Sequence, residues 1–421
     1  MPVSAVFLMS ILILFLVSMR AQALVGLESL ETRLMNTNQE ILSLKQTIEA
    51  KSSLVRASQS GFYPSLDLVG GWQQNKIDGM AESEKGTVAY IEGRYNLFNG
   101  FKDRSNLNQK EFDLKLAQIE LESKTRSLRL ELTEIISEMI RIHALQDILK
   151  EEYKITQHHK QLAIKKVNAG LTSSIDNLEF DLRESEVKIE QQQIDQIHKE
   201  MHQKIVRIYG EDVADAELDK IDFSPFKELS RSNYGSMSSD SGKTFSIEKN
   251  LGYQKSEINL LKAELNKTEV QSGFMPKLDF TFNIGRLTPS EETPIKLNES
   301  KYGVALVIPL FSGFDVYHKT KAARFQMASA EKSKKQKIID LQAEYEILTY
   351  KVSELSELYR INEFKLIQSQ KYSDLTNAEY KRGVKNSPDL VGATERLFSA
   401  KKRKYEILRD LELLKVKIAN L

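Results

Sequence analysis

The sequence has no cysteine, and this absence removes several classes of site. The chain can form no disulfide, offers no thiolate to a metal or a substrate, and cannot carry a lipid on a Cys. Charge of one sign is lacking too, since 60 Lys+Arg oppose 59 Asp+Glu and the formal net charge is +1. This balance argues against a nucleic-acid-binding protein that relies on a positive field.

Long apolar segments are scarce as well. Only residues 5–19 form an extended apolar run, which excludes a membrane protein with many spanning helices. The run precedes Ala21-Gln22-Ala23, a small-x-small pattern typical of signal-peptidase sites. We therefore expect residues 1–23 to be a signal peptide. The alternative is an uncleaved inner-membrane anchor, because no Lys or Arg precedes the run.

What the sequence does contain is an internal repeat. Three pairs of segments match in the same order, at offsets of 212 or 213 residues: 60–68 (SGFYPSLDL) with 272–280 (SGFMPKLDF), 97–101 (LFNGF) with 310–314 (LFSGF), and 168–176 (NAGLTSSID) with 381–389 (KRGVKNSPD). We expect a tandem duplication, with repeats at 24–214 and 247–421. The segment 215–246 is rich in Ser, Asp and Gly and is expected to be a linker.

Each repeat contains two segments in which apolar and polar residues alternate, which is typical of strands with one apolar face. The expected β-hairpins span residues 62–98 and 274–311. The positions expected on the apolar face are Leu66, Leu68, Gly70 and Trp72; Ala89, Ile91, Gly93, Tyr95 and Leu97; Leu278, Phe280, Phe282 and Ile284; and Tyr302, Val304, Leu306, Ile308 and Leu310.

Long segments without Pro follow each hairpin and predict long helices. In residues 101–170, apolar side chains recur in steps of four and three: Leu128, Leu132, Ile135, Met139 and Ile142. The second repeat has a matching stripe: Leu341, Tyr345, Leu348, Val352, Leu355 and Tyr359. This spacing is coiled-coil periodicity. A helix over 101–170 would be ~100 Å long at 1.5 Å per residue.

Each long helix is expected to end at a turn and to return antiparallel to itself. Gly170 and Gly383 suit the left-handed residue that ends a helix, and Ser174 and Ser387 suit the cap of the next one. The expected helical hairpins therefore span 101–209 and 313–420. The fold class is mainly α with a small β part, made of tandem-duplicated long helical hairpins plus four strands.

Four strands are too few to close a membrane barrel, because single-chain barrels begin at about eight strands. An open sheet edge cannot be satisfied in hydrocarbon, so a membrane-spanning sheet requires oligomerisation, with two copies giving eight strands and three giving twelve. The alternative is a small soluble sheet with one solvated face.

These motifs together resemble the TolC-type outer-membrane efflux and type I secretion channels. The resemblance covers nearly all of the chain after the signal peptide and rests on Gly-Phe-x-Pro-x-Leu-Asp, Leu-Phe-x-Gly-Phe and Gly-x-x-x-Ser-x-Asp. It implies a homotrimer whose twelve-strand β-barrel in outer-membrane lipid continues into a periplasmic tunnel of helices. It also implies a passive exit duct that works with a periplasmic adaptor and an inner-membrane ABC or proton-driven transporter.

The resemblance further implies that the helical turns form the periplasmic entrance. The turn residues at 169–172 and 382–385, among them Gly170, Leu171, Thr172, Gly383, Val384 and Lys385, would contact the adaptor. Asp176, Tyr380 and Lys385 match positions that close the entrance, through a Lys385–Asp176 ion pair or a Tyr380–Asp176 hydrogen bond.

Asp389 would form an acidic ring in a trimer that favours cations. A second ring found in some members is replaced here by Gly392. Both Asp residues also suit the first turn of a helix, where they favour the helix dipole. Gating and simple capping therefore stay open as explanations.

No pattern in the sequence predicts catalysis, and we expect no catalytic, cofactor or metal site. His198 and His202 share a helix face but lack a third ligand, so a surface pair is the expected outcome. Two classes of protein remain as alternatives to the channel: a periplasmic coiled-coil adaptor, and a structural protein of an envelope-spanning complex. Duplicated strands with apolar faces favour the channel over both.

Overall fold

A computed structural model of the chain describes residues 27–75, 84–210, 245–289 and 297–421. The expected signal peptide lies outside the described residues, as does all but the end of the expected linker. The fold is mainly helical with one small antiparallel sheet, which confirms the predicted class.

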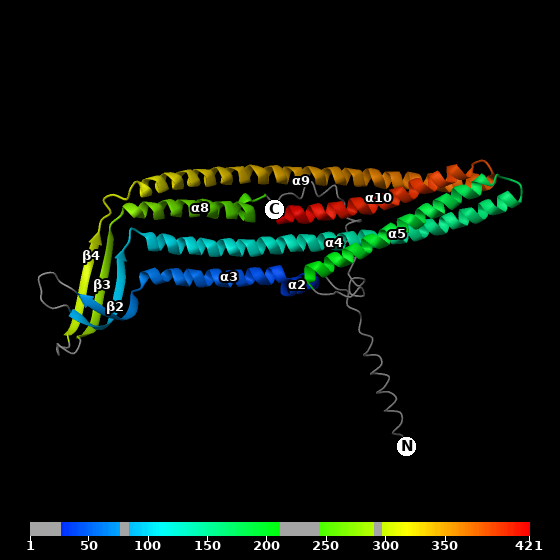
Figure 1. The fold of residues 1–421 in the computed structure, drawn as a ribbon. Coiled ribbons are helices and arrows are strands. Elements are labelled where there is room, and N and C mark those ends of the chain that lie inside the picture. The colour runs from blue at the N-terminus through cyan, green and yellow to red at the C-terminus, as the bar shows by residue number, and fades with distance from the viewer. Residues whose placement is uncertain (1–26, 76–83, 211–244, 290–296) are drawn as a thin grey trace, which may run out of the picture. The chain divides into compact units, whose positions relative to one another are not determined.

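The same order of elements occurs twice after a short first helix (Figure 1). Helix α2 spans Leu27–Thr37. The first series is α3 (Gln39–Ser58), β1 (Ser65–Asn75), β2 (Glu84–Phe98), α4 (Lys102–Asn168) and α5 (Ile175–Tyr209). The second is α8 (Leu251–Gln271), β3 (Lys277–Pro289), β4 (Leu297–Val307), α9 (Asp315–Arg382) and α10 (Ser387–Asn420).

The long helices have the predicted bounds to within a few residues. Helices α4 and α9 contain 67 and 68 residues and no Pro or Gly, so nothing in their sequence interrupts the hydrogen-bond ladder. Among the described residues, no helix combines the length and apolar character needed to cross a bilayer.

The described chain divides into two compact units, and each unit draws on both repeats. The sheet unit contains Ser43–Ser123 and Ser246–Leu341. The helical unit contains Lys124–Phe245 and Gln342–Leu421 together with the chain up to Leu42.

In the sheet unit the strand order is β1-β2-β3-β4, and all neighbours are antiparallel. The register aligns Leu68 with Ile91 and Ile91 with Ile284. Phe280 is aligned with Val304 in turn. Because alternate residues share a face, the apolar positions predicted within these strands lie on one continuous face. Three predicted positions fall outside that agreement. Leu97 lies in the register shift between Asn96 and Phe98, so Phe98 is aligned with Leu278 in its place. Ile308 and Leu310 lie beyond the end of β4 at Val307.

The opposite face of the sheet is polar. Asp67 is aligned with Glu92, Glu92 with Asn283, and Asn283 with Lys301. Many apolar side chains on the other face are exposed in the single chain; Leu68 is 82% and Tyr302 81% exposed. The sheet therefore presents one apolar and one polar surface.

In the helical unit, α4 is buried on more than one side. Leu132, Met139 and Ile142 on the predicted stripe are almost fully buried, and Ile136 and Ile140, which lie outside that stripe, are buried too. Helix α9 has one buried stripe, which includes Leu341 and Leu348 as predicted.

Helix α2 is anchored to the end of α5. The buried Asn38 donates from Nδ2 to the Ile208 carbonyl oxygen at 2.6 Å, and its Oδ1 accepts from the Ile41 amide at 3.0 Å. The Tyr209 hydroxyl donates to the Leu30 carbonyl at 2.9 Å. These contacts account for the break between α2 and α3 and for the place where α5 ends.

Candidate functional site: the paired helical turns

The turn between α4 and α5 closes with a left-handed glycine. Gly170 has φ +70°, and its amide donates to the Val167 carbonyl at 2.9 Å. The Leu171 amide reaches back to the Lys166 carbonyl, also at 2.9 Å. This pair of bonds is a Schellman motif, which satisfies the last carbonyls of a helix.

The turn between α9 and α10 repeats this geometry. Gly383 has φ +83°, its amide donates to the Tyr380 carbonyl at 3.1 Å, and the Val384 amide donates to the Glu379 carbonyl at 3.0 Å. The internal repeat therefore conserves the backbone of the turn, as the matched glycines predict.

The helix caps differ from the prediction. Ser387 is the first residue of α10, and Asn386 is the cap, with Oδ1 accepting from the Asp389 amide at 3.1 Å. Ser174 precedes α5 but makes no capping hydrogen bond with its side chain. Ser174 thus stands at the predicted N-cap position of α5. The prediction is wrong for Ser387, because the Asn386 side chain one residue earlier accepts the capping hydrogen bond and leaves the Ser387 hydroxyl free for another contact.

That other contact is with Asp176. The Ser387 hydroxyl donates to Asp176 Oδ1, and the Thr172 hydroxyl donates to Oδ2 of the same carboxylate. Asp176 thus joins the start of α5 to the start of α10.

Asp389, the counterpart of Asp176 in the second repeat, is held differently. Lys385 Nζ lies 3.8 Å from Asp389 Oδ2, and both side chains are more than a third exposed. Lys385 occupies the position of Thr172, four residues before the Asp. Each Asp therefore interacts with the side chain one turn earlier, through a hydroxyl in one repeat and an ammonium in the other.

Within the described chain, the structure does not bring Lys385 to Asp176. The Tyr380 hydroxyl has no hydrogen-bond partner among the described residues, although the charge of Asp176 acts on it. Burial first, and Asp176 second, raise the pKa of Tyr380 to about 12. The phenol therefore stays protonated and keeps its proton available to donate.

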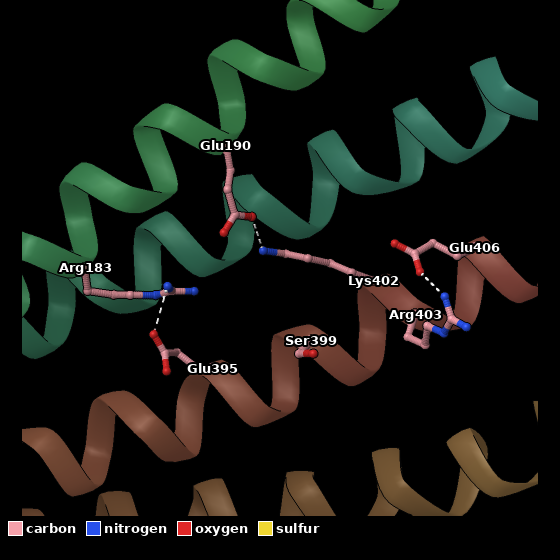
Figure 2. A pocket seen from close by; sticks show the side chains of 7 residues that line it. All are labelled: Arg183, Glu190, Glu395, Ser399, Lys402, Arg403 and Glu406. Atoms are coloured by element: carbon pink, nitrogen blue, oxygen red, sulfur yellow. Dashed lines mark hydrogen bonds and ion pairs between the residues drawn. The ribbon is translucent and has the colours of Figure 1, made fainter. Parts of the chain in front are cut away.

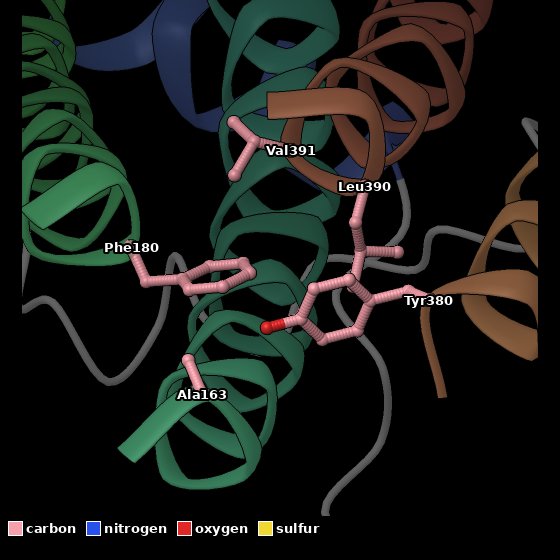
Figure 3. Packing of buried hydrophobic residues seen from close by; sticks show 5 residues of the cluster. All are labelled: Ala163, Phe180, Tyr380, Leu390 and Val391. Atoms are coloured by element: carbon pink, nitrogen blue, oxygen red, sulfur yellow. The ribbon is translucent and has the colours of Figure 1, made fainter. Parts of the chain in front are cut away.

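Tyr380 belongs to a small apolar core between the two turns (Figure 3). Its ring meets the Phe180 ring edge-on, with centroids 6.1 Å apart, and its hydroxyl is directed toward Phe180. The members of this tip core are Ala163 of α4, Phe180 of α5, Tyr380 of α9, and Leu390 and Val391 of α10. All four helices of the two hairpins thus meet beneath the turns.

The residues expected to contact an adaptor lie at the outside of the turns. Leu171 is 75% and Val384 70% exposed, and they occupy the same position in the two Schellman motifs. An apolar residue at this position commonly packs on the third residue from the helix end. Here those residues are Lys166 and Glu379, so the two apolar side chains remain available to a partner.

A buried ion-pair network lies along the same helices. Glu152 of α4 is fully buried and pairs with Arg183 of α5 and with Lys402 of α10, the latter at 3.1 Å. Arg183 also lies 2.9 Å from Glu395, and Lys402 also pairs with Glu190 (Figure 2). These pairs border a charged hollow between α5 and α10. The network crosslinks α10 to the first hairpin.

Sequence reasoning missed this network and the role of Lys166, whose ammonium contacts Tyr380. Charged residues are frequent on every helix of the chain, so composition gives no signal for the few that are buried. In the described part of the chain, no group of three or more His, Asp or Glu side chains is placed to hold a metal ion.

Comparison with solved structures shows the same fold. The outer-membrane channel OprN aligns with TM-score 0.78 and 13% identity over 94% of this chain and 89% of its own. The outer membrane protein VceC of Vibrio cholerae aligns with TM-score 0.78 and 12% identity over 93% of this chain and 94% of its own. The outer membrane channel CmeC of Campylobacter jejuni aligns with TM-score 0.76 and 12% identity over 94% of this chain and 84% of its own. No curated protein shows significant similarity in sequence.

The model of one protein family, described as outer membrane efflux protein, matches residues 32–210 and 247–416. These two segments cover most of the chain and contain both sets of helices, strands and turns. The match confirms the resemblance drawn from the repeated motifs. The chain belongs to the outer membrane efflux protein family.

Proposed function

We propose that three copies of this chain form an outer-membrane channel that serves as the passive exit duct of a tripartite efflux pump or a type I secretion system. The observation that carries the proposal is the sheet, with one continuous apolar face and two unpaired edges at β1 and β4. In a trimer, β4 of one copy pairs with β1 of the next, so that twelve strands close with their apolar side chains toward lipid.

The helices support the same assembly. On α5, the exposed residues Ile175, Leu178, Leu182 and Ile189 share one face, opposite the buried Phe180 and Val187. On α9, a second exposed stripe lies opposite the buried one: Ile347, Tyr350, Ile361, Phe364 and Leu375. Exposed apolar residues gathered on one face of a helix are a feature of protein interfaces. We assign these faces to contacts between neighbouring copies in a helical tunnel.

The paired turns are the proposed periplasmic entrance. Leu171 and Val384 would meet the helical tip of an adaptor, flanked by Thr172 and Lys385. Asp176, Tyr380, Lys385 and Asp389 would control passage, with Lys385 of one copy reaching Asp176 of the next in place of its own Asp389. The 3.8 Å separation of Lys385 and Asp389 supports this exchange, because an exposed pair at that distance costs little to break.

The proposal includes export by a signal peptide at residues 1–23 and two repeats, 24–214 and 247–421, joined by 215–246. Energy for transport would come from an inner-membrane ABC or proton-driven transporter.

The experiment is membrane fractionation of the full chain followed by gel analysis without heating. We expect trimers that resist mild heating, in the outer-membrane fraction, and step-like currents after the purified protein is added to planar bilayers. A monomer confined to the inner-membrane fraction would refute the proposal and favour an adaptor.

A further inference from the structure

Lys166 lies where the two turns meet. Its carbonyl accepts the Leu171 amide in the first Schellman motif, and its ammonium donates to the Tyr380 carbonyl, which accepts the Gly383 amide in the second motif. The same ammonium lies 3.9 Å from the centroid of the Tyr380 ring. One side chain therefore contacts the end of the other hairpin through both a carbonyl and an aromatic face.

The repeat shows that this contact is one-directional. At the offset of 213 residues, Glu379 takes the place of Lys166, and Val167 takes the place of Tyr380. Neither counterpart can make the reverse contact, because one is an anion and the other has no aromatic ring. The backbone of the turns is duplicated, whereas the contact between them is specific to one pair of residues.

The contact is also well placed to resist separation of the turns. Tyr380 is 1% exposed and is held by the tip core, so it is a fixed anchor. The hydrogen bond from Ser387 to Asp176 makes a second connection between the two hairpins. A hydrogen bond to a charged donor is stronger than one between neutral groups, and an ammonium over an aromatic face adds to it.

We propose that Lys166 is the latch that ties the two hairpin tips of one chain, and that its release from Tyr380 accompanies opening of the entrance. This proposal rests on the proposed channel function. It assigns a positioning role to a residue outside the Asp176, Tyr380, Lys385 and Asp389 set, and it places this connection within each copy.

The test compares Lys166→Met with Lys165→Met, each as full-length protein in planar bilayers. Both changes remove one positive charge from the same turn of α4. Lys165, however, is exposed, and within the described part of the chain its side chain contacts neither Tyr380 nor the turn between α9 and α10. We expect Lys166→Met to raise the open probability about tenfold, the shift expected from loss of one charge-assisted hydrogen bond. Lys165→Met should match the unmodified channel.

Two further variants keep the proposal open to refutation. Lys166→Arg keeps the charge and the donors and should restore the unmodified open probability. If Lys166→Met fails to insert, Lys166→Gln, a neutral donor, should show a smaller rise in the same direction. The latch is refuted if channels form and Lys166→Met or Lys166→Gln behaves like Lys165→Met, whereas absence of any channel from the unmodified chain would refute the channel function instead.

Discussion

Asp176 and Ser387 share a hydrogen bond although they lie 211 positions apart and belong to different repeats. Thr172 donates to the same carboxylate from one turn earlier. Asp176 is therefore held from both hairpins, whereas its counterpart Asp389 interacts with Lys385 of its own turn. The two copies of one motif therefore make different contacts.

Under the proposed function, removing the polar groups at the helical turns should open the channel. We expect Asp176→Ala combined with Lys385→Ala to raise the open probability by about tenfold, since a lost hydrogen bond to a charged group is worth about that factor. Asp315→Ala with Lys319→Ala also removes one acidic and one basic residue, from an exposed ion pair of 2.7 Å, and should have no effect. Equal single-channel records from the two double variants would count against the gate.

Asp389 should influence ions more than opening. Three copies would bring three Asp389 carboxylates together. Asp389→Asn removes their negative charge and keeps the size of the side chain. We expect the variant to lose preference for cations, measured as the reversal potential in a salt gradient. An unchanged reversal potential would leave Asp389 with a capping role only.

The sheet contains a glycine against which a neighbouring aromatic ring packs closely. A Cβ on Gly93 would lie 2.1 Å from Cε1 of Phe282, its neighbour across the strands. We expect Gly93→Ala to destabilise the sheet by about 1–3 kcal/mol, the usual cost of overpacking. Gly303→Ala is the control, because nothing lies within 4 Å of its added Cβ. In thermal melts followed by circular dichroism, the strand signal of Gly93→Ala should be lost at a lower temperature than that of Gly303→Ala.

The buried pair of Arg183 and Glu152 should matter more than any exposed pair. Arg183→Met leaves the fully buried Glu152 with Lys402 alone, and breaking a buried pair costs about 3–5 kcal/mol. Arg360→Met is the control, since Arg360 is 76% exposed and pairs with an exposed Glu357. We expect the melting temperature to fall markedly for Arg183→Met and to stay unchanged for Arg360→Met. Similar melting temperatures would show that Lys402 compensates.

Stability should fall in mild acid because of His159. Burial, with smaller contributions from the charges of His158 and Lys381, lowers the pKa of His159 to about 4. The ordinary pKa of a histidine is 6.5. Between pH 6.5 and pH 4, the unfolded chain therefore binds a proton at His159 that the folded chain does not, and the stability of the fold decreases as the pH falls through this window. The free energy of unfolding should decrease by about 3 kcal/mol at most, because each unit of pKa difference between the folded and unfolded chain corresponds to about 1.36 kcal/mol.

Replacing this histidine should flatten the profile. His159→Phe adds an apolar ring beside Phe180, whose ring lies 6.0 Å away, and removes the titrating group. We expect its melting temperature to change less between pH 7 and pH 4 than that of His158→Phe, in which an exposed histidine is lost. Parallel pH profiles for the two variants would contradict this assignment.

The sequence predicted most of the architecture, because the repeat supplies two independent copies of each signal. Matched glycines predicted both turns, and alternation predicted the apolar face that the register from Leu68 to Ile284 bears out. The caps were wrong where neighbouring polar residues compete, as Asn386 and Ser387 do. Lys166 and Arg183 were missed because their partners come from other helices, and periodicity within a helix carries no information about such partners.

The strand order has a consequence for how the protein is made. β2 belongs to the first series of elements and pairs with β3 of the second, so the first hairpin waits for its neighbour while the ribosome adds α4, α5 and the segment that follows. A lone hairpin is marginally stable in water, and apolar strands left unpaired are prone to aggregate. The first two strands therefore lack the neighbour of β2 until β3 has been synthesised.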